Sequence, residues 1–205
     1  MPYLLRVELP DVPGSLGRLA TTIGLAGGDI EAIEIVEKRH DGTAVDDVLL
    51  ETNAMPDSIV SACNALDGVE VVWVSRYAAG GNLVLDLEAV EELTADPDGA
   101  LNRLIDLLPV TFRADWACRV SRSEGTVYAT SAAPADLEWL PVDRAALLET
   151  DDENTVLCGA RLNKTEIVVI GRRGGPAFLD SEMARLGHLV GLAMSISRAA
   201  KAPAH

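Results

Sequence analysis

Histidine and cysteine, the residues that most often bind transition metals, are scarce in this sequence. Its 205 residues include three histidines and three cysteines, and no two of these six lie close together in the chain. Protein zinc sites take three or four such ligands, usually at short spacings. We therefore expect no metal site and interpret His40 and His188 as structural residues. Cys63, Cys118 and Cys158 lie in apolar runs, which predicts buried, reduced thiols rather than disulfide bonds.

Basic residues are also few, with 17 Lys and Arg against 32 Asp and Glu and a formal net charge of −15. An acidic protein is a poor ligand for nucleic acids and anionic membranes, so we expect neither as a partner. The imbalance is uneven, because residues 161–205 hold seven basic and three acidic side chains. This C-terminal excess is compatible with a local basic face or, more simply, with a solvated helix end.

Long apolar runs are absent as well. No run approaches the roughly 20 residues that a membrane-spanning helix needs, and the N-terminus lacks the apolar core of a signal peptide. The sequence therefore predicts a cytoplasmic protein without a membrane segment.

Catalytic signatures are missing too: the sequence has no nucleophile elbow, phosphate loop or dinucleotide fingerprint. Asp46 and Asp47 are adjacent carboxylates, but neighbouring residues of a strand point to opposite faces. We interpret them, and the acidic run 151–153, as solvated charge rather than an acid–base pair. The basic segment 171–175 is interpreted as a solvated hairpin end. We expect neither enzyme activity nor a cofactor.

Residues 9–19 form the segment around which the first half of the chain is organised. Residues 3–9 alternate like a strand, and residues 16–23 have apolar side chains at helical spacing. Gly14 permits a tight turn between them, and Ser15 is the predicted N-cap of the helix. Such a turn directs free N–H groups and a positive helix end toward one spot, which suits a carboxylate. The alternative is an ordinary turn and cap that bind nothing.

A second motif follows the predicted helix, where Gly27 and Gly28 precede a strand that opens with Asp29 and Ile30. The two motifs together resemble the ACT domain, a small-molecule-binding module with the signature Asp-x-Pro-Gly-x-Leu and then Gly-(Asn or Asp)-Ile. The matching positions are Asp11, Pro13, Gly14, Leu16, Gly28, Asp29 and Ile30.

The resemblance implies a site for a free amino acid between paired domains. The implied ligand-binding residues are Asp11, Val12, Pro13, Gly14, Ser15, Leu16, Gly28, Asp29 and Ile30. Backbone N–H groups of residues 14–17 are expected to hold the ligand carboxylate, and Asp29 to accept a charge-assisted hydrogen bond from its ammonium group.

The remainder of the first domain completes a β-α-β-β-α-β order, the ferredoxin-like arrangement. A hairpin is predicted at residues 40–43, strands at 44–52 and 69–77, and a helix from Pro56. In the last strand we expect Val72 and Val74 on one face and Val71 and Trp73 on the other. Both faces are then apolar, so the face without helices is expected to be buried against a partner or the next domain.

The break at residues 78–81 separates the two halves. We predict an ACT-like domain at 1–78, a linker at 79–82, a GAF-like domain at 83–199 and a disordered tail at 200–205. In the second half, helices are predicted from Asn82 and from Asp96-Pro97, and strands at 116–121, 126–130, 156–162 and 166–172. A long helix from about Ser181 is predicted to be capped by Asp180 or Ser181.

The end of this half resembles a GAF domain. The resemblance rests on the strand pair near residues 156–171, a glycine-rich turn and a Pro-x-Phe-x-Asp-x-Glu motif. That motif falls on Pro176, Phe178, Asp180 and Glu182. Residues 131–154 occupy the place of the segment that roofs the GAF pocket. The overall fold class predicted is therefore α+β: a ferredoxin-like ACT domain followed by a GAF-like domain with an antiparallel sheet.

These features predict a non-enzymatic regulatory protein that senses a small ligand, most simply a free amino acid at the ACT domain. The alternative is a ligand-free interaction scaffold or a regulatory partner of another, unidentified protein. We also predict a homodimer, because Gly187, Gly191 and Ser195 follow one another on one side of the last helix. Small residues in that register let a second helix approach closely, unless the face packs on its own sheet.

Overall fold

The computed structural model describes residues 1–76 and 82–201, which form two compact units, Met1–Gly81 and Asn82–His205. Residues 79–81 of the predicted linker and 202–205 of the predicted tail lie outside the described residues. None of the described helices combines the length and apolar character needed to cross a membrane.

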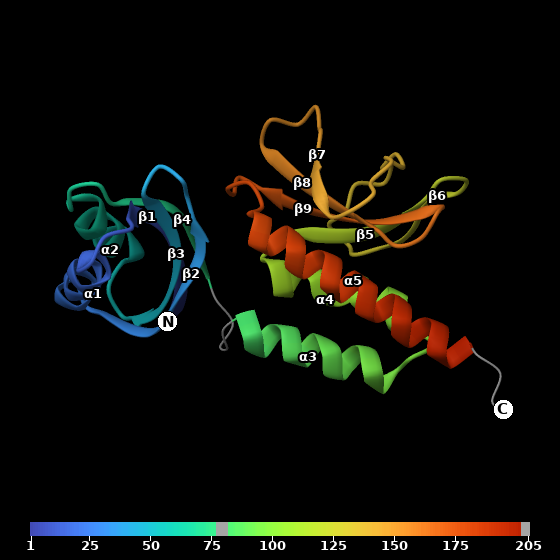
Figure 1. Ribbon diagram of the computed structural model, residues 1–205, viewed down its shortest axis with the longest axis horizontal. Coiled ribbons are helices and arrows are strands. Elements are labelled where there is room, and N and C mark those ends of the chain that lie inside the picture. The colour runs from blue at the N-terminus through green and yellow to red at the C-terminus, as the bar shows by residue number, and fades with distance from the viewer. Residues whose placement is uncertain (77–81, 202–205) are drawn as a thin grey trace. The chain divides into compact units, whose positions relative to one another are not determined.

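The first unit is a four-stranded antiparallel sheet with both helices on one face (Figure 1). Its elements are β1 (Pro2–Pro10), α1 (Ser15–Leu25), β2 (Gly28–Lys38), β3 (Thr43–Thr52), α2 (Pro56–Asn64) and β4 (Glu70–Arg76). The strand order is β2-β3-β1-β4, so β1 and β3 are central and β2 and β4 are edges. The predicted order of elements is confirmed.

The core of this unit lies between the helix-covered face of the sheet and the two helices. Apolar side chains at alternate positions of β1 and β3, such as Val7 and Val48, pack against Leu19 and Ile23 of α1 and Ile59 of α2. Burial of these side chains drives the association of the helices with the sheet.

The predicted division of β4 into two faces is wrong, because a bulge interrupts the alternation. Arg6 pairs with Trp73 and Val7 with Val71, so Val72 is an extra residue in a β-bulge. The bulge reverses the pattern after it. Val71 and Val74 therefore pack toward the helices, while Trp73 contacts the opposite face of the sheet.

The second unit is a five-stranded antiparallel sheet in the order β6-β5-β9-β8-β7. Its elements are α3 (Asn82–Ala95), α4 (Ala100–Phe112), β5 (Trp116–Ser121), β6 (Gly125–Ala129), β7 (Ala146–Leu148), β8 (Thr155–Arg161), β9 (Glu166–Arg173) and α5 (Asp180–Lys201). Helices α4 and α5 pack on one face of the sheet, and α3 packs on α4 and α5 (Figure 1). The opposite face is covered by apolar side chains from the segment before β7, including Leu137 and Trp139.

Two predictions in this unit need correction. Helix α4 begins at Ala100 after Gly99, so Pro97 is not its first residue but part of the preceding turn. There Asp96 Oδ1 accepts a hydrogen bond from the Gly99 N–H at 3.2 Å. Strand β7 was not predicted, because it is three residues long and lies inside the segment 131–154 that shows no clear pattern.

A buried ion pair joins β9 to α5. Arg172, predicted to be solvated, is 1% exposed, and its Nη2 lies 2.8 Å from Oε1 of Glu182. The same nitrogen donates to the Phe112 carbonyl at 2.8 Å, Nη1 donates to the Pro176 carbonyl at 3.1 Å, and the guanidinium stacks on Phe178. Arg172 thereby connects the end of α4, the glycine-rich turn and α5.

Glu182 also caps the last helix. Its Oε2 accepts a hydrogen bond from the Leu179 N–H at 2.9 Å, one residue before α5 begins. This is the glutamate half of a capping box. Asp180 and Ser181, the predicted caps, lie inside the helix.

We expect Glu182→Ala to lower the free energy of unfolding by about 3–5 kcal/mol, because it leaves the buried Arg172 charge without its carboxylate. Urea denaturation measures this change. The matched control is Glu92→Ala, which removes an exposed ion pair to Arg103 and should change the same free energy by no more than about 1 kcal/mol. Equal effects of the two variants would contradict the structural role of Glu182.

Candidate functional site

The loop between β1 and α1 has a fixed backbone. Gly14 has a positive φ of 91°, a conformation that favours glycine, and it is the N-cap of α1. The Asp11 N–H donates to the Gly42 carbonyl at 2.8 Å, which ties the loop to the β2–β3 hairpin. The Ser15 N–H donates to the Val12 carbonyl at 3.2 Å. The loop is therefore held to the sheet on one side and to the helix on the other.

The predicted cap is wrong, since Ser15 is the first helical residue and its side chain is buried. Helix α1 also has no side-chain cap and no acidic residue in its first turn. Within the described residues, the N–H groups of Leu16 and Gly17 have no acceptor, whereas the Arg18 N–H bonds to the Gly14 carbonyl. These two donors are available to an anion at the positive end of the helix.

A cavity of about 290 Å³ lies beneath this loop. The predicted ligand-binding residues that border it are Asp11, Val12, Pro13, Gly14, Ser15 and Leu16. The sheet contributes Ile35 from β2 and Ala44 and Asp46 from β3. This volume is close to the lower end of the range for ligand pockets and suits a molecule of amino-acid size.

Asp46 is the residue of this cavity that sequence reasoning missed. It is 1% exposed rather than solvated, and within residues 1–76 and 82–201 its Oδ1 has no hydrogen-bond partner. It pairs with Val7 on the helix-covered face of β3, whereas Asp47 points to the other face and bonds to Arg6 at 2.8 Å. The position was visible in the sequence, because Asp46 alternates with the apolar residues Ala44 and Val48.

The environment of Asp46 favours its neutral form. Burial raises the pKa of its carboxyl group to about 6, the carboxylates of Asp11 and Asp47 act in the same direction, and Lys38 opposes them. Lys38 Nζ itself lies 2.9 Å from Oδ2 of Asp11 in an exposed ion pair. The cavity is thus bordered by the buried carboxyl group of Asp46, and the exposed ammonium group of Lys38 lies beside its loop.

Gly28, Asp29 and Ile30 lie elsewhere. Gly28 pairs with Thr52 at one end of β3, while Pro10, just before the loop, pairs with Thr43 at the other end. The nine-residue step along β2 from Asp29 to Lys38 spans about 30 Å at roughly 3.3 Å per residue. A single chain therefore does not bring Asp29 to the loop at Gly14. Gly28 has a packing role, because a Cβ there would lie 2.6 Å from Ile23 Cγ2.

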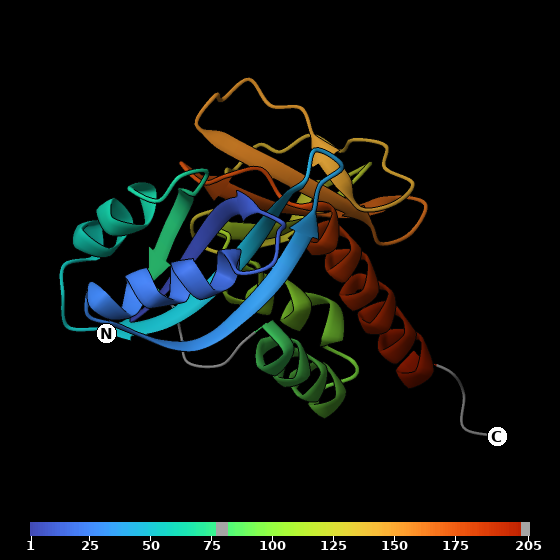
Figure 2. The ribbon, with the colours of Figure 1, turned by 60° about the vertical axis from the view of Figure 1, so that its left-hand side comes forward.

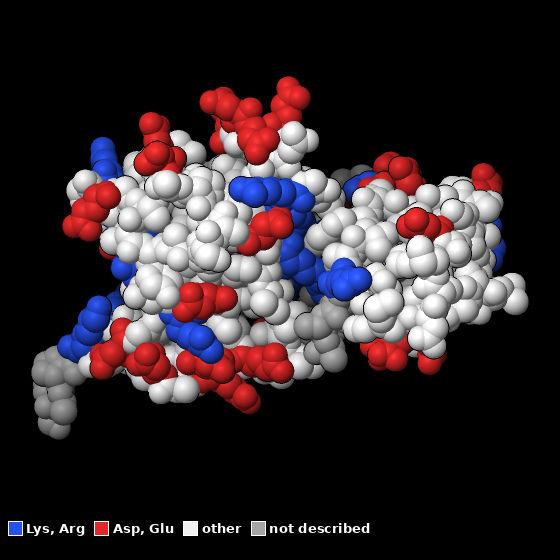
Figure 3. All heavy atoms as spheres, turned by 180° about the vertical axis from the view of Figure 1, so that it is seen from behind, with Lys and Arg blue, Asp and Glu red and all other residues white. Residues whose placement is uncertain are grey.

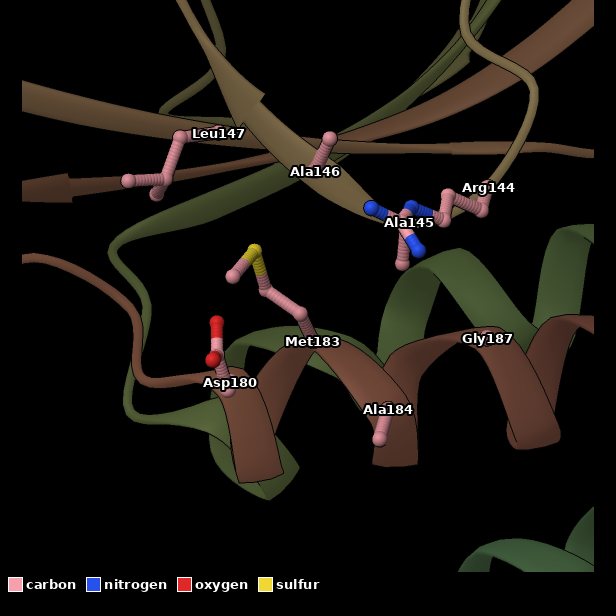
Figure 4. Close-up of a pocket in the computed structure, with 8 residues that line it drawn as sticks. All are labelled: Arg144, Ala145, Ala146, Leu147, Asp180, Met183, Ala184 and Gly187. Atoms are coloured by element: carbon pink, nitrogen blue, oxygen red, sulfur yellow. The ribbon is translucent and has the colours of Figure 1, made fainter. Parts of the chain in front are cut away.

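The second unit contains a larger cavity of about 550 Å³ between β7 and the start of α5 (Figure 4). Its walls include Leu147 and Met183, with Arg144 and Asp180 as charged groups that are both exposed. None of the residues that border it is a buried polar group. It therefore offers shape and apolar contact but no fixed polar recognition.

Within residues 1–76 and 82–201, no group of three or more His, Cys, Asp and Glu side chains could hold a metal ion. His40 and His188 are exposed, and the three cysteines are buried and free. On the face seen in Figure 3, acidic side chains are spread widely and basic ones form only small groups.

Comparison with known families identifies the first unit. Residues 3–68 match the model of the ACT domain. This part of the chain is an ACT domain. The ACT domain is a regulatory, ligand-binding module, so the chain carries a module of that kind.

Among curated proteins, the chain is similar to NAD-dependent malic enzyme 1 of Bacillus subtilis (strain 168), at 40% identity over 73 residues. That match covers 35% of this chain and 17% of the enzyme, so the chain spans less than a fifth of its relative.

Two solved structures show a distant similarity to this chain. One is the GAF domain of an Acinetobacter phosphoenolpyruvate-protein phosphotransferase, with a TM-score of 0.45 and 10% identity over 62% of this chain and 99% of that one. The other is an unknown protein from Galdieria sulphuraria, with a TM-score of 0.33 and 12% identity over 97% of this chain and 92% of that one. Neither likeness is close enough to indicate a ligand.

The raised pKa of Asp46 predicts a dependence of stability on pH. A carboxyl group whose pKa is higher in the folded state than in the unfolded state stabilises the fold at pH values below its unfolded pKa, where it is protonated. For Asp46 this stabilisation is lost as the pH rises through the folded pKa of about 6. We expect Asp46→Asn to remove this loss and to raise the free energy of unfolding near neutral pH by about 1–3 kcal/mol, since one pKa unit corresponds to about 1.4 kcal/mol.

Urea denaturation at several pH values tests this expectation. Asp57→Asn is the control, because Asp57 is an exposed carboxylate in the first turn of α2. If wild type and Asp46→Asn lose stability equally between about pH 4 and pH 6, the proposed ionisation of Asp46 is wrong.

Proposed function

We propose that this protein is a non-enzymatic regulatory protein that senses a free amino acid at its ACT domain. The observation that carries the proposal is the pair of free N–H groups at Leu16 and Gly17, at the start of a helix whose first residues border a cavity. A carboxylate placed there would accept two hydrogen bonds and lie at the positive end of the helix dipole.

The cavity supports a small ligand rather than a nucleotide or a lipid. Its volume of about 290 Å³ is about half that of the cavity beside α5. Its walls combine apolar side chains, such as Leu9 and Ile35, with the polar residues Ser15 and Asp46. A compact molecule with a charged end and a short apolar part matches that lining.

A second copy of the chain would complete the predicted site. Strand β2 is an edge of the sheet, and Ile35 on it is 45% exposed. Antiparallel pairing of β2 with the β2 strand of a second copy would place the first residues of one strand beside the last residues of the other. Asp29 of one copy would then approach Lys38, and through it Asp11, of the other copy. The homodimer thus explains how residues about 30 Å apart in one chain could serve one ligand.

An interaction scaffold is the second candidate function. Helix α3 supports it, because Leu83 is 71% exposed and Leu87 is 55% exposed at adjacent turns of the same helical face. An exposed apolar stripe of this kind is typical of a surface that contacts another protein. The two functions differ in their response to ligand: a sensor responds to an amino acid, and a scaffold binds its partner regardless.

We expect at least one of the twenty amino acids to bind with measurable heat and to raise the melting temperature by mass action. Isothermal titration calorimetry and a thermal shift assay at millimolar concentrations provide the test. Gly14→Val is the matched loss-of-function variant, because a branched side chain is strained at a φ of 91°. No heat and no shift from any amino acid with wild type would reject the sensor and favour the scaffold.

We further expect a dimeric mass by light scattering at tens of micromolar, from an interface that buries more than about 1,000 Å². Gly191→Leu should weaken the dimer if α5 contributes to it. It should not unfold the chain, because a Cβ at Gly191 meets nothing within 4 Å. Gly24→Leu, at an equally open glycine of α1, is the control. A monomeric mass with and without amino acids would end the dimer proposal.

A further inference from the structure

Two buried polar atoms in the ACT cavity have no hydrogen-bond partner among the residues that the structure describes. They are Oγ of Ser15 and Oδ1 of Asp46, on residues that are 4% and 1% exposed. Buried polar groups in folded proteins are nearly always hydrogen-bonded, because leaving one unpaired is costly. Both residues border the same cavity, so one molecule bound there could reach both groups.

The charges around Asp46 indicate what kind of group would bind it. Asp11 faces it from the loop and Asp47 follows it on β3, and both disfavour a further negative charge. The nearby cations are already paired, since Lys38 contacts Asp11 and Arg6 contacts Asp47. A ligand that brings its own positive charge would therefore be favoured at Asp46.

The start of α1, which borders the same cavity, has the complementary character. The free N–H groups of Leu16 and Gly17 belong to the first turn of α1, directly after Ser15. Leu16 borders the cavity and Gly17 follows it in the chain, so donors for an anion lie at the helix end. Ser15 and Asp46 provide acceptors for a cation in the same cavity. A molecule with a carboxylate and an ammonium group on adjacent atoms carries both charges within the span of one small pocket.

We infer that Asp46, assisted by Ser15, receives the ammonium group of the ligand, and that the cavity thereby selects amino acids over carboxylates that lack an amine. The inference rests on the proposed function and names the group that gives it specificity. It differs from the role implied for Asp29, which reaches this cavity only if a second copy supplies it.

Pairs of amino acids and their 2-hydroxy acids test the inference, because the two molecules of a pair share the carboxylate and the side chain. Alanine and lactate, leucine and 2-hydroxyisocaproate, and phenylalanine and 3-phenyllactate are titrated into wild type by calorimetry. The amino acid that binds most tightly in the twenty-member screen is added with its own hydroxy acid. We expect wild type to prefer the amino acid by about tenfold to a hundredfold, the effect of one charged hydrogen bond.

Three carboxylate variants locate the acceptor. Asp46→Asn should weaken binding of the amino acid by at least about tenfold and bring its affinity close to that of the hydroxy acid. The exposed control Asp57→Asn should keep the preference, and Asp29→Asn tests the competing assignment of the ammonium group to Asp29. Ser15→Ala should reduce the preference by a smaller factor, and it provides an independent test should Asp46→Asn not fold.

The outcomes separate the inference from the proposed function. If Asp46→Asn keeps the preference for the amino acid, or Asp29→Asn alone loses it, Asp46 is not the acceptor and the sensor function stands. If Asp46→Asn does not fold and Ser15→Ala keeps the full preference, the inference is equally overturned. If wild type binds none of the twenty amino acids, the proposed function fails, and the inference fails with it.

A pH series adds a second readout. Burial and the carboxylates of Asp11 and Asp47 raise the pKa of Asp46 to about 6 against the opposing effect of Lys38. Amino-acid affinity in wild type should therefore rise from about pH 5 to about pH 7 as Asp46 ionises, whereas Asp46→Asn should show no such rise. The same rise in both proteins would contradict the role of Asp46.

Discussion

The antiparallel pairing of β1 with β3 is the constraint on which the ACT domain depends. It places Pro10 opposite Thr43, so the Pro-Gly loop and the β2–β3 hairpin lie at the same end of the sheet and can share the Asp11–Gly42 hydrogen bond. It also places Asp46 opposite Val7, on the face that the helices cover. The cavity follows from this register, because a shift of one residue would turn Asp46 to the opposite face of the sheet.

The second unit is organised around a different kind of contact. A single arginine, Arg172, donates hydrogen bonds to the carbonyls of Phe112 and Pro176 and pairs with Glu182, so it joins three segments that are distant in the sequence. The Pro-x-Phe-x-Asp-x-Glu motif therefore has a structural explanation in this chain. Phe178 stacks on the arginine, and Glu182 both neutralises it and caps α5. None of these residues needs a ligand to account for its presence.

Most of the element order could be predicted because apolar periodicity and glycine turns are local properties of the sequence. The positions that could not be predicted depend on the partner strand or on tertiary packing. The bulge at Val72 is defined only by its pairing with β1, and the start of α4 at Ala100 depends on a turn that Asp96 stabilises.

Asp46 was missed because hydrophobicity argues against burying an acid, although its alternation with Ala44 and Val48 placed it on the core face. The separation of Asp29 from Gly14 required the strand order, which a sequence motif does not contain.

The position of β2 at the edge of the sheet has a consequence for how such a protein would report a ligand. A site assembled from opposite ends of the same strand in two copies makes the ligand a bridge between them, so binding and association become one linked equilibrium. Ligand would then raise the association constant, and the apparent ligand affinity would increase with protein concentration. Cellular abundance would set the sensitivity of the response, and any partner that competed for the same strand edge would act as an antagonist without touching the cavity.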